Sequence, residues 1–113
     1  MAKASRDKGK RGEREFAAFL TERGIPARRG VQFRGGGDSP DVVHAIPGVH
    51  FEVKRVEALK LLPSLHQASE DAGDKIPVVA WRKNGGAWIA ILRADDLVDI
   101  LVAEYQPDIE DLL

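Results

Sequence analysis

The chain has 113 residues, a formal net charge of −1 at pH 7 and no cysteine. The lack of cysteine excludes a disulfide framework, a zinc site built on thiolates and a cysteine nucleophile. The apolar runs are too short to span a membrane, and the basic first residues lack the apolar stretch of a signal peptide. Hydrophobic residues make up 43% of the chain and charged residues 31%, as in globular proteins. We therefore expect one soluble, cytoplasmic domain over residues 1–113.

Charge is distributed unevenly along the chain. Residues 1–34 carry ten Lys and Arg against four Asp and Glu, a net charge of +6, whereas residues 35–113 carry a net charge of −7. A small domain with one basic end suggests a polyanionic partner on that side. A solvated charged surface explains the same asymmetry, so charge alone leaves both interpretations open.

Apolar spacing and turn residues predict three helices and five strands. In chain order we expect a flexible basic arm over 1–8, a helix over 10–23, strands over 26–33, 41–46 and 49–55, a helix over 63–72, strands over 76–83 and 87–92, a helix over 95–103 and an acidic tail over 104–113. The turns at Pro47-Gly48 and Asn84-Gly85-Gly86 predict a hairpin on either side of the middle helix. The order αβββαββα gives an α/β fold, with one mixed five-stranded sheet flanked by helices and closed by the last helix.

Three residues of the second and third strands form a candidate catalytic group. Glu52 and Lys54 share one face of their strand because side chains alternate, and the expected hairpin brings Asp41 near Glu52. Two carboxylates suit a hard cation such as Mg²⁺, which also takes water and phosphate oxygens. A lysine beside that ion can orient or activate an attacking water. The alternative is an exposed strand with an ordinary surface ion pair between Glu52 and Lys54.

Glu13 is a third candidate carboxylate. It precedes Phe16, Ala17 and Leu20 by three, four and seven residues, which places it on the inward side of the first helix. A carboxylate facing a core is costly unless something compensates it, and a metal ion would do so. The alternative is a first-turn glutamate favoured by the helix dipole, an explanation that suits Glu15 better.

These features together resemble the PD-(D/E)xK nuclease superfamily and, within it, the archaeal-type Holliday junction resolvases and their bacteriophage relatives. The resemblance rests on Lys10-Arg11-Gly12-Glu13-Arg14-Glu15-Phe16, Arg34-Gly35-Gly36-Gly37-Asp38-Ser39-Pro40-Asp41, Phe51-Glu52-Val53-Lys54-Arg55, and Gln67 followed by Asp74-Lys75-Ile76-Pro77-Val78-Val79-Ala80. It covers residues 9–103 with these motifs in the family's order. It implies a restriction-endonuclease-like core and metal-dependent hydrolysis of DNA phosphodiesters.

The resemblance also implies roles for individual residues. The metal ligands would be Asp41, Glu52, the backbone carbonyl of Val53 and, completing the acidic cluster, Glu13. Lys54 would handle the water, Gln67 would contact the water or the phosphate, and Ser39 would lie in a loop that contributes to catalysis and shapes the junction centre. The expected cofactor is Mg²⁺, with Mn²⁺ able to substitute. The expected partners are branched DNA and a second copy of the chain, in the host cytoplasm if the protein is phage-encoded.

Basic residues near these motifs are candidate DNA contacts. They are Lys10, Arg11, Arg14, Arg28, Arg29 and Arg34. For any one of them taken alone, a solvated surface position is the better explanation. His44, His50 and His66 have no zinc-ligand spacing, although His50 shares the strand face of Glu52.

Three functions remain open from the sequence. The favoured one is a homodimeric, Mg²⁺-dependent endonuclease that resolves four-way junctions by paired symmetric nicks. The second is another nuclease of this fold, acting on flaps, nicks or duplex DNA in repair or restriction. The third, a noncatalytic DNA-binding module, is disfavoured because it has no need of clustered acids facing a polyanion. The expected dimer surface combines the leucines of residues 59–65 with Trp81 and Trp88, unless these residues pack inside the monomer.

Overall fold

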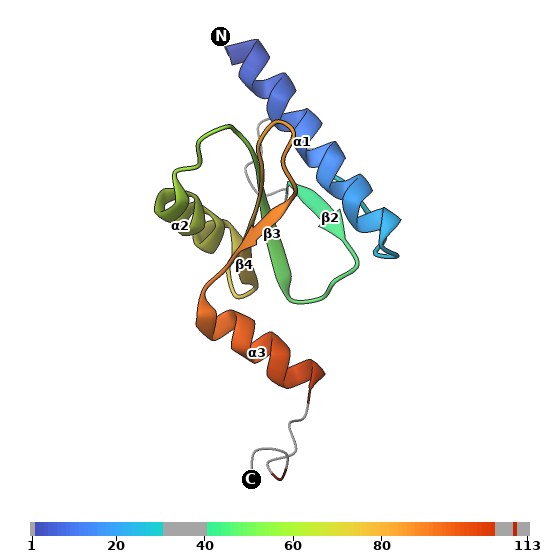
Figure 1. The fold of residues 1–113 in the computed structure, drawn as a ribbon, viewed down its shortest axis with the longest axis vertical. Helices are drawn as coiled ribbons and strands as arrows, with labels where there is room; N and C mark the ends of the chain where they lie inside the picture. The colour runs from blue at the N-terminus through green and yellow to red at the C-terminus, as the bar shows by residue number, and fades with distance from the viewer. Residues whose placement is uncertain (1, 31–40, 106–109, 111–113) are drawn as a thin grey trace.

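The computed structural model describes residues 2–30, 41–105 and 110, and Figure 1 shows the arrangement of its elements. In chain order these are α1 (Ala2–Glu22), β1 (Ala27–Arg29), β2 (Val42–His44), β3 (Val49–Arg55), α2 (Leu61–Ala72), β4 (Ile76–Arg82), β5 (Ile89–Ile91) and α3 (Ala94–Glu104). The predicted order αβββαββα is confirmed. The predicted loop over 35–40 and part of the first predicted strand lie outside the described residues.

The five strands form two sheets instead of one. In the larger sheet β3 pairs with β4 in parallel and β4 pairs with β5 antiparallel, in the order β3-β4-β5. The smaller sheet is the antiparallel pair β1-β2. The hairpin predicted between 76–83 and 87–92 is confirmed, whereas the hairpin predicted between 41–46 and 49–55 is wrong. The absence of a hairpin between the described strands β2 and β3 matters for the site, because it changes how Asp41 reaches β3.

Side chains join β2 to β3 where we expected a backbone ladder. The backbone N–H of Ile46 donates to Nδ1 of His44 at 3.0 Å, and Nε2 of the same ring donates to the carbonyl of Val49 at 3.0 Å. The N–H of Val53 donates to Oδ2 of Asp41 at 3.1 Å. These side chains satisfy backbone groups that a hairpin would pair with each other. The two sheets therefore meet at a seam built from His44 and Asp41.

The core lies between α1 and the larger sheet. Phe16, Ala17 and Leu20 of α1 are buried, as the apolar spacing predicted. The ring of Phe16 makes edge contacts with Phe51 at a centroid distance of 4.9 Å and with Trp88 at 5.0 Å. Trp88 thus packs inside the monomer, and its assignment to a dimer surface is not supported.

The opposite face of β3 is covered by α2. This helix buries small residues, Ser64, Ala68 and Ala72, which let it lie close to the sheet. It ends at Gly73, whose φ of 62° lies in the left-handed region that glycine adopts most easily. Thus α1 packs against one face of β3 and α2 against the other, so both faces of this strand are covered.

Both ends of the chain differ from expectation. The first helix begins at Ala2, so residues 2–8 are helical and not a flexible arm. Apolar spacing could not reveal this, because these residues are polar; the Ala, Lys and Arg among them nonetheless have high helix propensity. The last helix forms as predicted but does not close the fold: no residue of α3 is buried, and Leu97 and Leu101 are exposed. Most of the predicted acidic tail, residues 106–109 and 111–113, lies outside the described residues.

Candidate active site

Strand β3 places Glu52 and Lys54 on the face that α2 covers. The Glu52 side chain is only 6% exposed, and its Oε1 lies 3.6 Å from Nζ of Lys54. Nζ of Lys54 also donates to Oε1 of Gln67 on α2 at 3.1 Å. The ammonium is therefore held between a buried carboxylate and a neutral amide. The structure brings together these three predicted site residues, and an ordinary exposed ion pair does not describe a carboxylate buried to this degree.

Asp41 approaches from the smaller sheet, just before β2. Its Oδ2 accepts the Val53 N–H described above, which places the carboxylate beside the backbone between Glu52 and Lys54. The pKa of Asp41 is raised from 3.8 to about 6, mainly by burial and then by the nearby negative charges of Glu52 and Glu13. The Val53 hydrogen bond and His50 act in the opposite direction. The pKa therefore reports several carboxylates crowded into one poorly solvated place.

Glu13 faces the same region from α1 and has an internal counter-ion. Its Oε1 accepts a hydrogen bond from Nε of Arg29 on β1 at 3.1 Å, and its side chain is 19% exposed. The expectation that Glu13 points inward is met. The first-turn alternative fails because α1 begins at Ala2, so Glu13 lies in the middle of the helix. Arg29 therefore compensates the negative charge of Glu13, a role for which the sequence suggested only a metal ion.

Gly12 allows α1 to approach β3 closely. A Cβ atom at Gly12 would lie 2.7 Å from Cβ of Arg55 and 3.6 Å from a methyl carbon of Val53. The first distance is far below van der Waals contact and involves an atom close to the backbone, so any larger residue must displace the helix. Gly12 therefore fixes the distance from which the adjoining Glu13 reaches the site.

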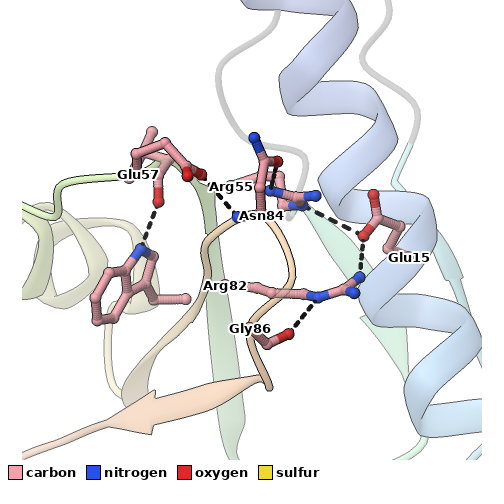
Figure 2. A network of polar contacts seen from close by, with 8 residues as sticks. Glu15, Arg55, Glu57, Arg82, Asn84 and Gly86 are labelled. Atoms are coloured by element: carbon pink, nitrogen blue, oxygen red, sulfur yellow. Dashed lines mark hydrogen bonds and ion pairs between the residues drawn. The ribbon is translucent and has the colours of Figure 1, made fainter.

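A second network of polar contacts, centred on Glu15, anchors α1 to the larger sheet. Figure 2 shows Glu15 between two arginines of the larger sheet, with Oε2 accepting from Nε of Arg55 and from the guanidinium of Arg82. Arg55 also donates to the side chain of Asn84 at 2.8 Å, and Arg82 donates to the carbonyl of Gly86 at 2.8 Å. The helix-dipole explanation for Glu15 is thus wrong, because Glu15 joins α1 to Arg55 of β3 and Arg82 of β4.

The predicted DNA contacts fall into three groups. Lys10, Arg11 and Arg14 on α1 are exposed, as is Arg28 on β1. Arg29 instead faces the acidic cluster through its contact with Glu13. Arg34 and Ser39 lie outside the described residues. The exposed members thus put positive charge on α1 on either side of Glu13 in the sequence, and on β1 next to Arg29.

The donor set of this site suits a hard divalent cation. Asp41 and Glu52 offer carboxylate oxygens, the ligands that Mg²⁺ prefers, and their mutual repulsion is what a cation would relieve. Sequence reasoning found these residues but missed Gly12 and the Glu15 network. A glycine in a helix is a weak signal of close packing, and the arginine partners of Glu15 lie 40 and 67 residues away.

Comparisons with known proteins agree with this geometry. Residues 4–108 match the archaeal Holliday junction resolvase (Hjc) family. The chain belongs to this family. The expected function, a Holliday junction-resolving nuclease, is thereby confirmed, and metal dependence is general for the family.

A solved structure supports the fold independently. The Hjc of Archaeoglobus fulgidus, a Holliday junction resolvase from an archaeal hyperthermophile, superposes with a TM-score of 0.52 at 22% identity, covering 73% of this chain and 74% of that one. This likeness confirms the restriction-endonuclease-like fold class. A search of curated proteins gave no match. None of the described helices is long and apolar enough to cross a membrane.

Proposed function

We propose that this Hjc family member cuts four-way DNA junctions with Mg²⁺ as its cofactor and as a homodimer that makes two symmetric nicks. The observation that carries the proposal is the bond from the Val53 N–H to Asp41, which places this carboxylate beside the backbone between Glu52 and Lys54, themselves in contact. Clustered acids that face a polyanion are unfavourable for binding alone, and they are the ligands that a phosphodiesterase metal needs.

Each residue of the cluster has a distinct role in this proposal. Asp41, Glu52 and the carbonyl of Val53 would hold the cation, which when bound neutralises charge on the phosphate and acidifies a water molecule. Lys54 would orient the attacking water, and Gln67 would hold the lysine in place by accepting a hydrogen bond from its ammonium group. Glu13 completes the acidic cluster while Arg29 balances its charge. The pairing leaves Glu13 suited to a water-mediated contact.

Exposed basic residues beside the cluster would bind the DNA backbone. Arg14 follows Lys10 by four residues and Arg11 by three, so it neighbours each of them on the surface of α1. Arg28 adds a charge from β1. We also propose that Arg34 and Ser39, which precede Asp41 in the sequence, contact the DNA junction.

The dimer follows from the reaction. One chain provides one acidic cluster, whereas resolution of a four-way junction needs a cut on each of two opposing strands. A twofold axis relating two chains meets this requirement, and C₂ dimers are the commonest oligomers. Of the leucines expected at the interface, Leu61 and Leu62 are exposed at the start of α2 and remain available for it.

A substrate comparison tests the proposal. Cleavage of a four-way junction, a flap and a linear duplex of equal length is measured with Mg²⁺, using wild type and Glu52→Gln, which removes a ligand charge with little change of shape. We expect paired nicks in the junction only, and none with the variant. Preferential cutting of the flap would favour a repair nuclease of the same fold, and equal cutting by Glu52→Gln would refute this site.

A further inference from the structure

A second group of ligands adjoins the nuclease site on the face of β3 that α2 covers. His50 lies two residues before Glu52 and therefore projects from the same face of the strand. Asp71, in the last turn of α2, reaches the same place. One ligand atom from each of His50, Glu52 and Asp71 lies within 4.8 Å of the other two.

The His50 side chain is the observation that points to a ligand. Its residue is 8% exposed, and its Nε2 is buried without a hydrogen-bond partner among the described residues. Nε2 lies 3.8 Å from Oε2 of Glu52, too far for a hydrogen bond. A buried ring nitrogen without a partner is costly, and one that faces two carboxylates is placed as a metal ligand.

We propose that His50, Glu52 and Asp71 bind a divalent transition metal of the Zn²⁺ class, at a site distinct from the proposed Mg²⁺ position. Two atoms about 2.1 Å from one tetrahedral ion are about 3.4 Å apart, close to the His50–Glu52 spacing. The imidazole selects against Mg²⁺ and Ca²⁺, which prefer oxygen. Asp71 is exposed and free to adjust, and the partial negative charge at the C-terminal end of α2 also favours a cation.

This site would position the nuclease carboxylate. Oε1 of Glu52 faces Lys54, whereas Oε2 faces His50. An ion on the second oxygen would link β3 to the end of α2 and fix the carboxylate whose first oxygen faces the proposed catalytic lysine. The inference does not rest on the nuclease assignment, since binding is measured without DNA.

Zn²⁺ titration of the metal-free protein by calorimetry tests the proposal. The Asp41→Asn background removes a ligand of the nuclease site, so that the remaining Zn²⁺ binding reports the second site. We expect one Zn²⁺ per chain in this background and at least about a tenfold loss of affinity on adding Asp71→Asn. The matched control is Glu70→Gln, which removes one negative charge from the neighbouring position of α2 and should leave the affinity unchanged.

Two further measurements keep the test independent of folding and of activity. In the Asp41→Asn background, the imidazole NMR signals of His50 should shift with Zn²⁺ but not with Mg²⁺. Zn²⁺ should also raise the Tm of the Asp41→Asn variant and not that of the Asp41→Asn/Asp71→Asn double variant, since position 71 is exposed and its substitution leaves the fold intact. Unchanged Zn²⁺ affinity in Asp71→Asn would overturn the proposal. So would loss of affinity in Glu70→Gln, which would place the ion at the exposed His66–Glu70 pair.

Discussion

Asp41 should destabilise the metal-free protein at neutral pH, because its charge is the one most strongly opposed by its surroundings. Burial, followed by the charge of Glu52, raises its pKa from 3.8 to about 6. The folded chain therefore binds this proton more tightly than the unfolded chain does. The free energy of unfolding must then fall as pH rises from about 4 to about 6, and it stays low above that range.

The size of the effect follows from the shift. At about 1.4 kcal/mol per pKa unit, the rise from 3.8 to about 6 corresponds to about 3 kcal/mol. Asn at position 41 carries no charge, and its amide oxygen can still accept the Val53 N–H. Asp41→Asn should therefore be more stable than wild type by up to about 3 kcal/mol at about pH 7.5, and by much less at about pH 4.

Urea unfolding in EDTA at these two pH values measures the difference. Asp74→Asn is the control, because it makes the same substitution at an exposed acid beyond α2 and should not change the pH dependence. Mg²⁺ should then stabilise wild type and leave Asp41→Asn unaffected, since the ligand must be deprotonated to bind. If Asp41→Asn were no more stable than wild type at about pH 7.5, the carboxylates would not be crowded, and the argument for a cation between them would fail.

Three other variants test separate features of the site. Gly12→Ala should lower the free energy of unfolding by about 1–3 kcal/mol, whereas Gly9→Ala, with nothing within 4 Å, should raise it by about 1 kcal/mol. If both variants changed the free energy of unfolding in urea by the same amount, the close approach of α1 to β3 would not depend on Gly12. Lys54→Ala should reduce the cleavage rate by about 10²–10⁴-fold while Mg²⁺ affinity changes little, and a lost affinity at unchanged rate would make Lys54 structural. Arg28→Ala should flatten the slope of log affinity for junction DNA against log salt by about 0.9. Arg29→Ala should change that slope less because Arg29 faces Glu13, and equal slopes would return Arg29 to the DNA-binding surface.

The central part of the site was predictable because it depends on local geometry. Strand β3 has the bounds expected from the sequence, and alternation along it correctly placed Glu52 and Lys54 on one face. Helical spacing likewise placed Glu13 on the inward side of α1. In both cases a period of two or 3.6 residues is enough to assign a side chain to a face.

The partners of these residues could not be predicted in the same way. Arg29 is 16 residues from Glu13, and the arginines that hold Glu15 are farther still. The break between the two sheets depends on His44 and Asp41, whose side chains compete with the backbone for hydrogen bonds in a manner that strand propensity does not describe. The sequence does not predict His50 as a metal ligand, because Asp71, the partner that we propose for it, lies 21 residues away on another element and no short spacing marks the pair.

Helix α1 explains how a site divided between two sheets can hold its shape. Asp41 immediately precedes β2 of the smaller sheet, whereas Glu52 and Lys54 belong to the larger one, and a hydrogen bond from Val53 links the two parts at the site. On α1, Glu13 is bound to Arg29 of the smaller sheet and Glu15 to two arginines of the larger sheet (Figure 2). Two glutamates separated by a single residue on one rigid helix thus tie both sheets to the same element. The spacing of the carboxylates in this candidate site therefore depends on α1 as well as on the strands that carry them.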